Sequence, residues 1–141
     1  QERFLLDSYG RLYNEGVAKG IGVSNMGSRG LKRAHKRLKE HHGAPLSALQ
    51  VQLSLLSREP VETELLALAR ELDVPVLGYS PLALGFFGTG FRKEKRASVT
   101  GIRRSLFEWL DGDSGVRNLI GEMQEVAKCH DRWEVADVAL A

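Results

Sequence analysis

The sequence has a single cysteine, Cys129, among its 141 residues. One cysteine cannot build an internal disulfide framework, so a disulfide-stapled secreted domain is excluded and a reducing compartment is expected. The uncharged apolar runs fall well short of the ~18 residues that a membrane-spanning helix needs. With only 4 prolines, 43% hydrophobic and 27% charged residues, the composition also excludes collagen-like and disordered chains. A globular fold remains.

An excess of one charge is lacking as well. Twenty Lys and Arg residues stand against 18 Asp and Glu, a net charge of +2, which is too balanced to indicate a nucleic-acid partner. The histidines show no metal-ligand spacing: His41 and His42 end a predicted helix, and His35 and His130 have no partner pattern. The sequence therefore predicts neither a nucleic-acid partner nor a metal site.

The two ends lack the features of a complete domain. The chain opens at Gln1 without Met or a basic-then-apolar leader, and residues 138–141 follow a helical pattern with no closing glycine. We interpret the chain as a piece of a longer protein. Because 141 residues suit one domain, we expect residues 1–141 to form a single, partial domain.

What the chain does contain is a repeated strand–helix pattern. Strand-like runs occur at residues 20–24, 48–53 and 74–79, about 30 residues apart, which is the usual size of a βαβ unit. The first intervening helix is predicted from an N-cap at Ser28 to Gly43, and the second has Glu62 and Glu64 in its first turn. The pattern predicts three parallel strands. The apolar positions of the two helices are Leu31, Ala34 and Leu38, then Leu65, Ala69 and Leu72.

Further helices flank this repeat. One precedes the first strand through Leu5, Tyr9 and Leu12, one covers residues 116–127, and one begins near Trp133. Residues 91–104, with several basic side chains, are predicted as a long solvated loop.

Alternation along the strands indicates which sheet is present. Gly20, Gly22 and Ser24 share one face of the first strand, and Gln50 and Gln52 share one face of the second. A doubly wound sheet is covered on both faces and is nearly continuously apolar, whereas a barrel can point small and polar side chains inward. The pattern favours a (β/α)₈ TIM barrel, of which 141 residues would supply about half.

In such a barrel the functional residues follow the carboxyl ends of the strands. Those ends carry Ser24-Asn25, residues 50–54 and residues 79–82. Asn, Gln and Ser side chains can pair with a carboxamide, and a Tyr ring can stack on a planar group. Small residues after Tyr79 would let backbone amides approach a pyrophosphate. Together these features fit a nicotinamide dinucleotide.

Three segments carry a resemblance to a known family. In order and spacing, three runs resemble segments of the aldo-keto reductase superfamily: GIGVSN (20–25), QVQLSLLSR (50–58) and YSPLALG (79–85). The resemblance is greatest to bacterial, plant and algal members of that superfamily. The resemblance covers residues 9–90, while residues 91–104 and 130–133 depart from the family pattern. It implies a (β/α)₈ barrel, present here as about strands five to seven, and NADP-dependent hydride transfer between NADPH and an aldehyde or ketone. It also implies the cytoplasm or a plastid stroma.

The resemblance also implies which residues bind the cofactor. Ser24, Asn25 and Gln50 would bind the nicotinamide carboxamide, and Tyr79 would stack on the nicotinamide ring. The residues expected along the pyrophosphate are Ser80, Pro81, Leu82 and Gly85. The family's catalytic Asp, Tyr, Lys and His, and its 2′-phosphate contacts, would lie outside this chain. Hence we assign no catalytic residue.

Plainer alternatives stay open at this point. Ser24-Asn25 is also a common turn, Gln50 can be a satisfied interior amide, and Tyr79 can be core packing. Arg58 is expected in a structural ion pair rather than at a ligand. For the whole protein, the alternatives are a non-catalytic nucleotide-binding module resembling channel β subunits, or a degenerate, inactive half-barrel.

Overall fold

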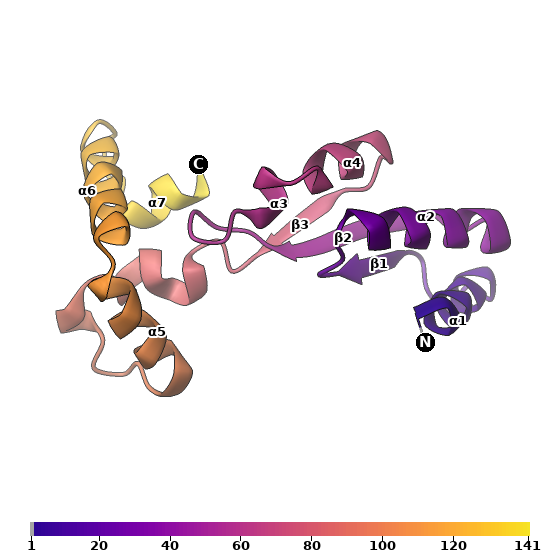
Figure 1. Cartoon of the computed structure of the whole chain (residues 1–141), viewed down its shortest axis with the longest axis horizontal. Helices are drawn as coiled ribbons and strands as arrows, with labels where there is room; N and C mark the ends of the chain where they lie inside the picture. Colours follow the sequence, from indigo (N-terminus) through magenta and orange to yellow (C-terminus); the bar gives the residue numbers. More distant parts are fainter. Residues whose placement is uncertain (1) are drawn as a thin grey trace. The chain divides into compact units, whose positions relative to one another are not determined.

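The computed structural model describes residues 2–141, and these form two units (Figure 1). The first unit comprises the chain up to Leu53 together with Ser57–Tyr79, and the second comprises Ser54–Leu56 and Ser80–Ala141. Elements of the first unit are α1 (Glu2–Asn14), β1 (Ile21–Ser24), α2 (Ser28–His42), β2 (Leu46–Gln52), α3 (Glu59–Glu62), α4 (Leu65–Glu71) and β3 (Val76–Tyr79). Elements of the second are the short turns η1 (Ala83–Gly85), η2 (Phe86–Gly90) and η3 (Lys93–Lys95), then α5 (Gly101–Gly112), α6 (Ser114–Lys128) and α7 (Val135–Leu140).

The first unit is built on a parallel sheet, as predicted. Within the described residues three strands pair in the order β1-β2-β3, and their arrowheads point the same way in Figure 1. The register places Ser24 beside Gln50 and Gln52 beside Tyr79. Side chains of register partners in a parallel sheet share a face, so these four residues lie on the same side.

The two faces of the sheet differ as the alternation predicts. Ile21, Leu49 and Val51 are buried beneath the helices, whereas Ser24 and Gln50 on the other face are exposed. The open face also carries Leu77, an apolar side chain with 53% of its surface exposed. A doubly wound sheet has helices on both faces, whereas this α/β sheet leaves one face with exposed polar side chains. The arrangement therefore fits part of a barrel better than a doubly wound sheet.

Helix α2 contributes three residues to the core beneath this sheet. Leu31, Ala34 and Leu38 are fully buried, which confirms the predicted apolar stripe. The helix ends at Gly43, whose φ of 61° is left-handed and whose N–H caps the carbonyls of the last turn, also as predicted. Its start was predicted one residue late: Gly27 is the N-cap in place of Ser28 and makes no side-chain capping bond.

Helix α1 is clamped onto α2 by a charged cluster. The Asp7 carboxylate accepts two hydrogen bonds from Arg37, at 2.7 and 2.8 Å, and lies 3.1 Å from His42 Nε2. The His42 ring packs against Gly10, where a Cβ atom would lie 2.7 Å from Nδ1 and closer still to other ring atoms. Gly10 is therefore required by this close approach of the two helices.

The segment between β2 and β3 corrects the predicted single helix. Glu62 ends the short helix α3 rather than opening the next one, and Glu64 is the N-cap of α4. Thr63 separates the two helices with an extended backbone, φ −104° and ψ 174°. The predicted packing positions Leu65 and Ala69 are nevertheless buried.

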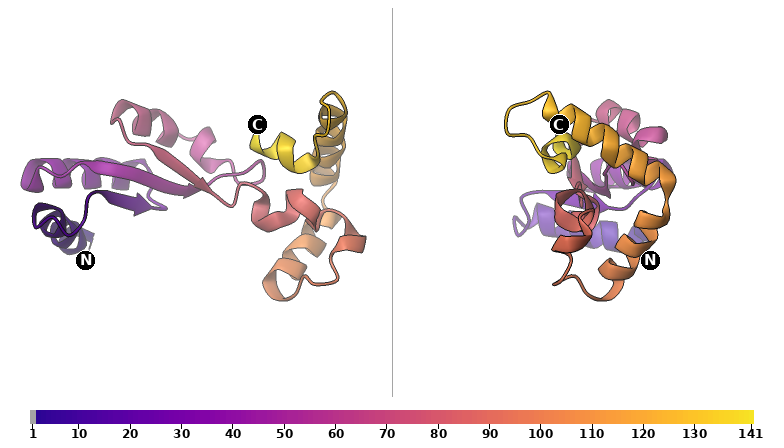
Figure 2. Two further views of the ribbon diagram at one scale, coloured as in Figure 1. Left: turned by 180° about the vertical axis from the view of Figure 1, so that it is seen from behind. Right: turned by 90° about the vertical axis from the view of Figure 1, so that its left-hand side faces the viewer.

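The second unit has its own aromatic core. Phe86, Phe87 and Phe107 are almost completely buried, and the Phe86 and Phe107 rings lie 5.4 Å apart. Figure 2 shows α5, α6 and α7 from two further sides. Helix α5 occupies residues that the prediction assigned in part to a loop, because residues 101–104 form its first turn. The predicted helix at 116–127 is confirmed as α6, and α7 follows Trp133.

Within residues 2–141, no helix is both long enough and apolar enough to cross a membrane.

Candidate functional site

The carboxyl ends of the parallel strands bring the predicted nicotinamide-binding residues of the first unit together. The Ser24 hydroxyl donates a long hydrogen bond, 3.5 Å, to Gln50 Oε1 on the neighbouring strand. The Tyr79 hydroxyl donates to Asn25 Oδ1 at 3.1 Å, although the two residues are 54 positions apart in the sequence. The four side chains thus form two hydrogen-bonded pairs at one edge of the sheet.

Asn25 is held there by its backbone. Its N–H donates to the Gln50 carbonyl at 2.8 Å, which extends the β1–β2 ladder by one bond beyond the strand. Its φ of 52° is left-handed, a conformation that Asn tolerates better than most residues with a side chain. The turn ends the strand and places the Asn25 amide beside Tyr79.

The polar groups of this edge retain free hydrogen-bonding capacity. Ser24, Asn25 and Gln50 are exposed, and Tyr79 is half-buried. In the two side-chain hydrogen bonds, the side-chain amide oxygens of Gln50 and Asn25 are the acceptors. Within residues 2–141, neither side-chain amide nitrogen donates to another side chain. An amide nitrogen can therefore donate to a ligand carbonyl without breaking either pair.

A concave surface adjoins the edge. A cavity of about 320 Å³ is lined by Asn25, Gln52 and Tyr79, and also by Met26 and Pro60. A second cavity, of about 380 Å³, lies between α1 and α2 against paired charges such as Arg37. This second cavity is lined by residues of α1 and α2 and by none of the strand-end residues. We therefore assign the candidate site to the cavity lined by Asn25, Gln52 and Tyr79.

The predicted pyrophosphate-binding residues begin the second unit. Ser80 (φ 54°), Ala83 (φ 49°), Leu84 (φ 58°) and Gly85 (φ 94°) are all left-handed. Left-handed conformation costs energy for a residue with a side chain and collects at ligand clamps and other functional segments. We call residues 80–85 the strained loop.

Backbone donors of the strained loop remain open to a ligand. Ala83 and Gly85 donate to the carbonyls of Ser80 and Leu82, at 2.9 and 3.0 Å. Within the described residues, the N–H groups of Ser80 and Leu82 have no backbone acceptor. Pro81, also predicted at the cofactor, has no N–H and can contribute only its ring and carbonyl.

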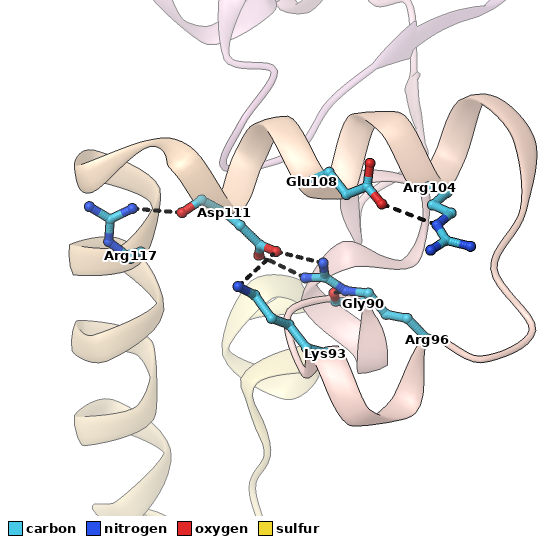
Figure 3. A network of polar contacts seen from close by, with 7 residues as sticks. All are labelled: Gly90, Lys93, Arg96, Arg104, Glu108, Asp111 and Arg117. Carbon is cyan, nitrogen blue, oxygen red and sulfur yellow. Dashed lines mark hydrogen bonds and ion pairs between the residues drawn. The ribbon is translucent and has the colours of Figure 1, made fainter.

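The basic segment after this loop is not solvated throughout, which corrects the prediction. The Arg96 side chain is only 11% exposed and donates to both carboxylate oxygens of Asp111 on α5 (Figure 3). Hydrogen bonds from Arg96 hold the pKa of Asp111 below its ordinary value, against the opposing effect of burial. Lys93 stays exposed, 3.7 Å from the same carboxylate.

Arg103 is a residue that the sequence-based reasoning missed. It lies in the first turn of α5, and its Nη2 donates to the Leu84 carbonyl of the strained loop at 2.6 Å. The signal that could have revealed it is the helical spacing of Leu106 and Leu110 after Gly101. That spacing would have turned part of the predicted loop into a helix.

Two further residues that the sequence singles out lie outside the candidate site. Arg58 pairs with Glu62 at 3.4 Å on the surface, as expected for a structural ion pair. Cys129 is an exposed free thiol. Within residues 2–141, no group of three or more His, Cys, Asp or Glu side chains could hold a metal ion.

Parallel strands that gather polar side chains at their carboxyl edge, with helices covering the opposite face, define an α/β protein of the type that binds ligands at strand ends. Comparison with known proteins assigns it more narrowly. A sequence model of the Aldo/keto reductase family matches residues 6–141, and the chain belongs to this family. The match extends well beyond residues 9–90, where the motif resemblance was evident.

Two curated plant proteins are similar to the chain. Pyridoxal reductase, chloroplastic, of Arabidopsis thaliana is 35% identical over 128 residues, which cover 91% of this chain and 34% of that protein. Probable aldo-keto reductase 1 of Glycine max is 38% identical over 78 residues, covering 55% of this chain and 20% of that protein. The aligned part is about a third of the first relative's length and a fifth of the second's.

Proposed function

We propose that the chain is part of an NADP-dependent aldo-keto reductase, in which residues 1–141 are one partial barrel domain. It supplies about strands five to seven of a (β/α)₈ barrel and carries part of the cofactor site. The observation that supports this most is the meeting of Ser24, Asn25, Gln50 and Tyr79 at one sheet edge. Family membership and the bare polar face of the sheet agree with it.

The donor set at the edge fits a nicotinamide. A carboxamide needs a donor for its oxygen and an acceptor for its nitrogen, and Ser and amide side chains offer both. The free nitrogens of Asn25 and Gln50 supply the donors, and the Ser24 hydroxyl adds an acceptor. The bond from Tyr79 to Asn25 fixes the phenol hydroxyl and thereby limits how the ring can turn. The proposed role of that ring is to stack on the nicotinamide.

The strained loop fits the diphosphate of a dinucleotide cofactor. Ser80 and Leu82 have N–H groups open to an anion, and Gly85 lacks a side chain that would keep a phosphate away. Pro81, whose ring fixes its φ angle, would contribute its ring and carbonyl to the proposed contacts. These residues bind through the main chain and carry no catalytic role.

The bound cofactor would supply a hydride for reduction of an aldehyde or ketone. This chain's own residues would bind and orient the nicotinamide, while proton transfer would fall to residues outside it. The Arabidopsis thaliana relative is named as a reductase of pyridoxal, an aldehyde, which supports this substrate class. Either the cytoplasm or a plastid stroma would suit such a protein.

The test is a titration of the intact protein with NADPH, with NADH in parallel, followed by an assay with a simple aldehyde. Gln50→Ala and Asn25→Ala should each weaken NADPH binding about 5- to 10-fold, since each removes a hydrogen bond of about 1 kcal/mol. Ser47→Ala is the control, because it changes an exposed polar side chain on the same strand that does not line the candidate cavity. Tyr79→Phe should keep most of the affinity, whereas Tyr79→Ala should not.

The outcomes separate the proposed functions. Saturable binding with turnover supports the reductase, and saturable binding without turnover supports a nucleotide-binding module. If no dinucleotide binds, or if Ser47→Ala weakens binding as much as Gln50→Ala, the assignment of this edge is wrong.

A further inference from the structure

The solvent-facing side of helix α2 is strongly basic, although the whole chain carries a net charge of only +2. We call its exposed cations the basic crest: Arg29, Lys32, Arg33, Lys36 and Lys39. The three lysines recur at a spacing of four and three residues, so they lie along one side of the helix. The single acidic residue of α2 is Glu40, in its last turn. The basic crest is therefore a local excess of positive charge.

Other side chains neutralise this excess only in part. Arg33 pairs with Glu2 of α1 at 2.9 Å, and Lys36 lies 4.0 Å from Glu40. Both pairs are exposed to solvent, where an ion pair is weak. The remaining cations of the crest take part in no ion pair within residues 2–141: Arg29, Lys32 and Lys39.

The arrangement disfavours the helix that carries it. Like charges three or four residues apart repel each other, as Lys36 does with both Lys32 and Lys39. Arg29 lies in the first turn, where the helix dipole favours acidic side chains, and that turn contains no acid. A negatively charged partner would relieve this repulsion. The basic crest is therefore suited to binding an anion that the protein does not itself supply.

A cavity adjoins the basic crest. The cavity of about 380 Å³ described above lies between α1 and α2, which run side by side in Figure 1. Its lining is largely apolar and includes the buried Leu6, while Arg33 and Lys36 of the crest also belong to it. Glu2 and Glu40 lie in the same lining and repel a uniformly negative surface. An apolar side chain therefore fits this cavity better than a phosphate does.

We propose that the basic crest and this cavity form a docking site for an acidic segment of a partner protein. One apolar side chain of the segment enters the cavity, and carboxylates beside it pair with the crest. At a rise of about 1.5 Å per residue, the crest from Lys32 to Lys39 is about 10 Å long. Three or four residues of an extended chain cover that length at about 3.3 Å each. The inference is independent of the proposed function, because no residue of the crest lines the candidate dinucleotide site.

The experiment measures binding of an end-blocked peptide of glutamates with one central leucine to the intact protein by calorimetry. The variant combines Lys32→Gln, Lys36→Gln and Lys39→Gln. We expect it to bind the peptide about tenfold more weakly, because three surface ion pairs are lost. Its unfolding midpoint should stay the same or rise, since Gln favours a helix about as well as Lys and the repulsion is gone. Binding to the wild type should weaken as ionic strength rises.

The matched control combines Lys19→Gln, Lys95→Gln and Lys128→Gln. It changes the net charge of the protein equally, at exposed positions outside the basic crest, and should bind the peptide as the wild type does. A second peptide, with glycine in place of the central leucine, should bind the wild type about 3- to 10-fold more weakly, because it leaves the cavity empty.

The proposal is wrong if the wild type does not bind the leucine peptide, or if the two triple variants bind it equally. Equal affinity for the leucine and glycine peptides would also overturn it, since the cavity would then have no occupant. Binding of phosphatidylglycerol vesicles or of RNA, without binding of the peptide, would assign the crest to a different partner. Titration of the crest variant with NADPH keeps this test separate from that of the proposed function, because its dinucleotide affinity should equal that of the wild type.

Discussion

Replacing Arg96 by Met tests whether a partly buried ion pair holds α5 against the preceding turns. The guanidinium donates to the two Asp111 carboxylate oxygens at 2.7 and 2.8 Å and also to the Gly90 carbonyl. It lies 5.5 Å from the centre of the Phe107 ring and 5.9 Å from that of Phe86. Methionine keeps the apolar packing on these rings but removes the charge and all three hydrogen bonds.

The expected cost follows from burial. Hydrogen bonds to charged groups contribute about 1.5–3 kcal/mol, and breaking a fully buried ion pair costs about 3–5 kcal/mol. Here the cost is smaller, because Asp111 keeps 18% of its side chain exposed and Lys93 remains 3.7 Å away. We therefore expect local destabilisation of about 2–3 kcal/mol, which corresponds to roughly 30- to 150-fold in an opening equilibrium.

Native-state hydrogen exchange of residues 101–112 measures this opening directly. The control is Arg104→Ala: that side chain is 68% exposed and pairs with Glu108 on the surface, so its loss should cost within about 0.5 kcal/mol. If Arg96→Met accelerates exchange no more than Arg104→Ala does, the ion pair does not hold α5. An increase spread equally over α6 would also contradict a local role.

Two further expectations concern the contact of α1 with α2. Gly10→Ala should destabilise the protein by about 1–3 kcal/mol in urea unfolding, because its Cβ would overlap the His42 ring, and adding His42→Ala should restore much of the loss. Failure of the double substitution to recover stability would refute the overlap. Hydrogen bonds from Arg37, and next from His42, hold the pKa of Asp7 well below its ordinary value of 3.8. Because the pKa of Asp7 is lower in the folded protein than in the unfolded chain, its ionised carboxylate stabilises the fold above the unfolded-state pKa, and this stabilisation is lost as the pH falls further. The difference in urea unfolding midpoint between wild type and Asp7→Asn should therefore narrow below about pH 4. A constant difference from about pH 6 to pH 3 would contradict this.

Local patterns predicted much of the first unit. Strand alternation assigned Leu49 and Val51 to the covered face and Gln50 to the bare face, because successive side chains in a strand must point to opposite sides. The stop of α2 at Gly43 was equally local, since glycine adopts the left-handed capping conformation at no steric cost. Thr63 shows the limit of such reasoning. Nothing in the helical spacing around it marks the extended residue that separates α3 from α4.

Residues 91–104 were predicted poorly for a different reason. Their glycines and cations are typical of a solvated loop, yet Arg96 is nearly buried and residue 101 begins a helix. A cation is buried only where a carboxylate meets it, and Asp111 lies 15 positions further along the chain. No local property of Arg96 distinguishes it from exposed Lys95.

The sequence by itself determined the family, the parallel strands and the identities of the edge residues, because motif order, period and residue chemistry are local properties. Only the tertiary structure decided which of these residues meet. The bond from Tyr79 to Asn25 spans 54 positions, and the bond from Arg103 to Leu84 spans 19. Such pairings depend on how strands align and how a helix packs against a loop. Register and packing are set by the whole hydrophobic core, and no single segment encodes them.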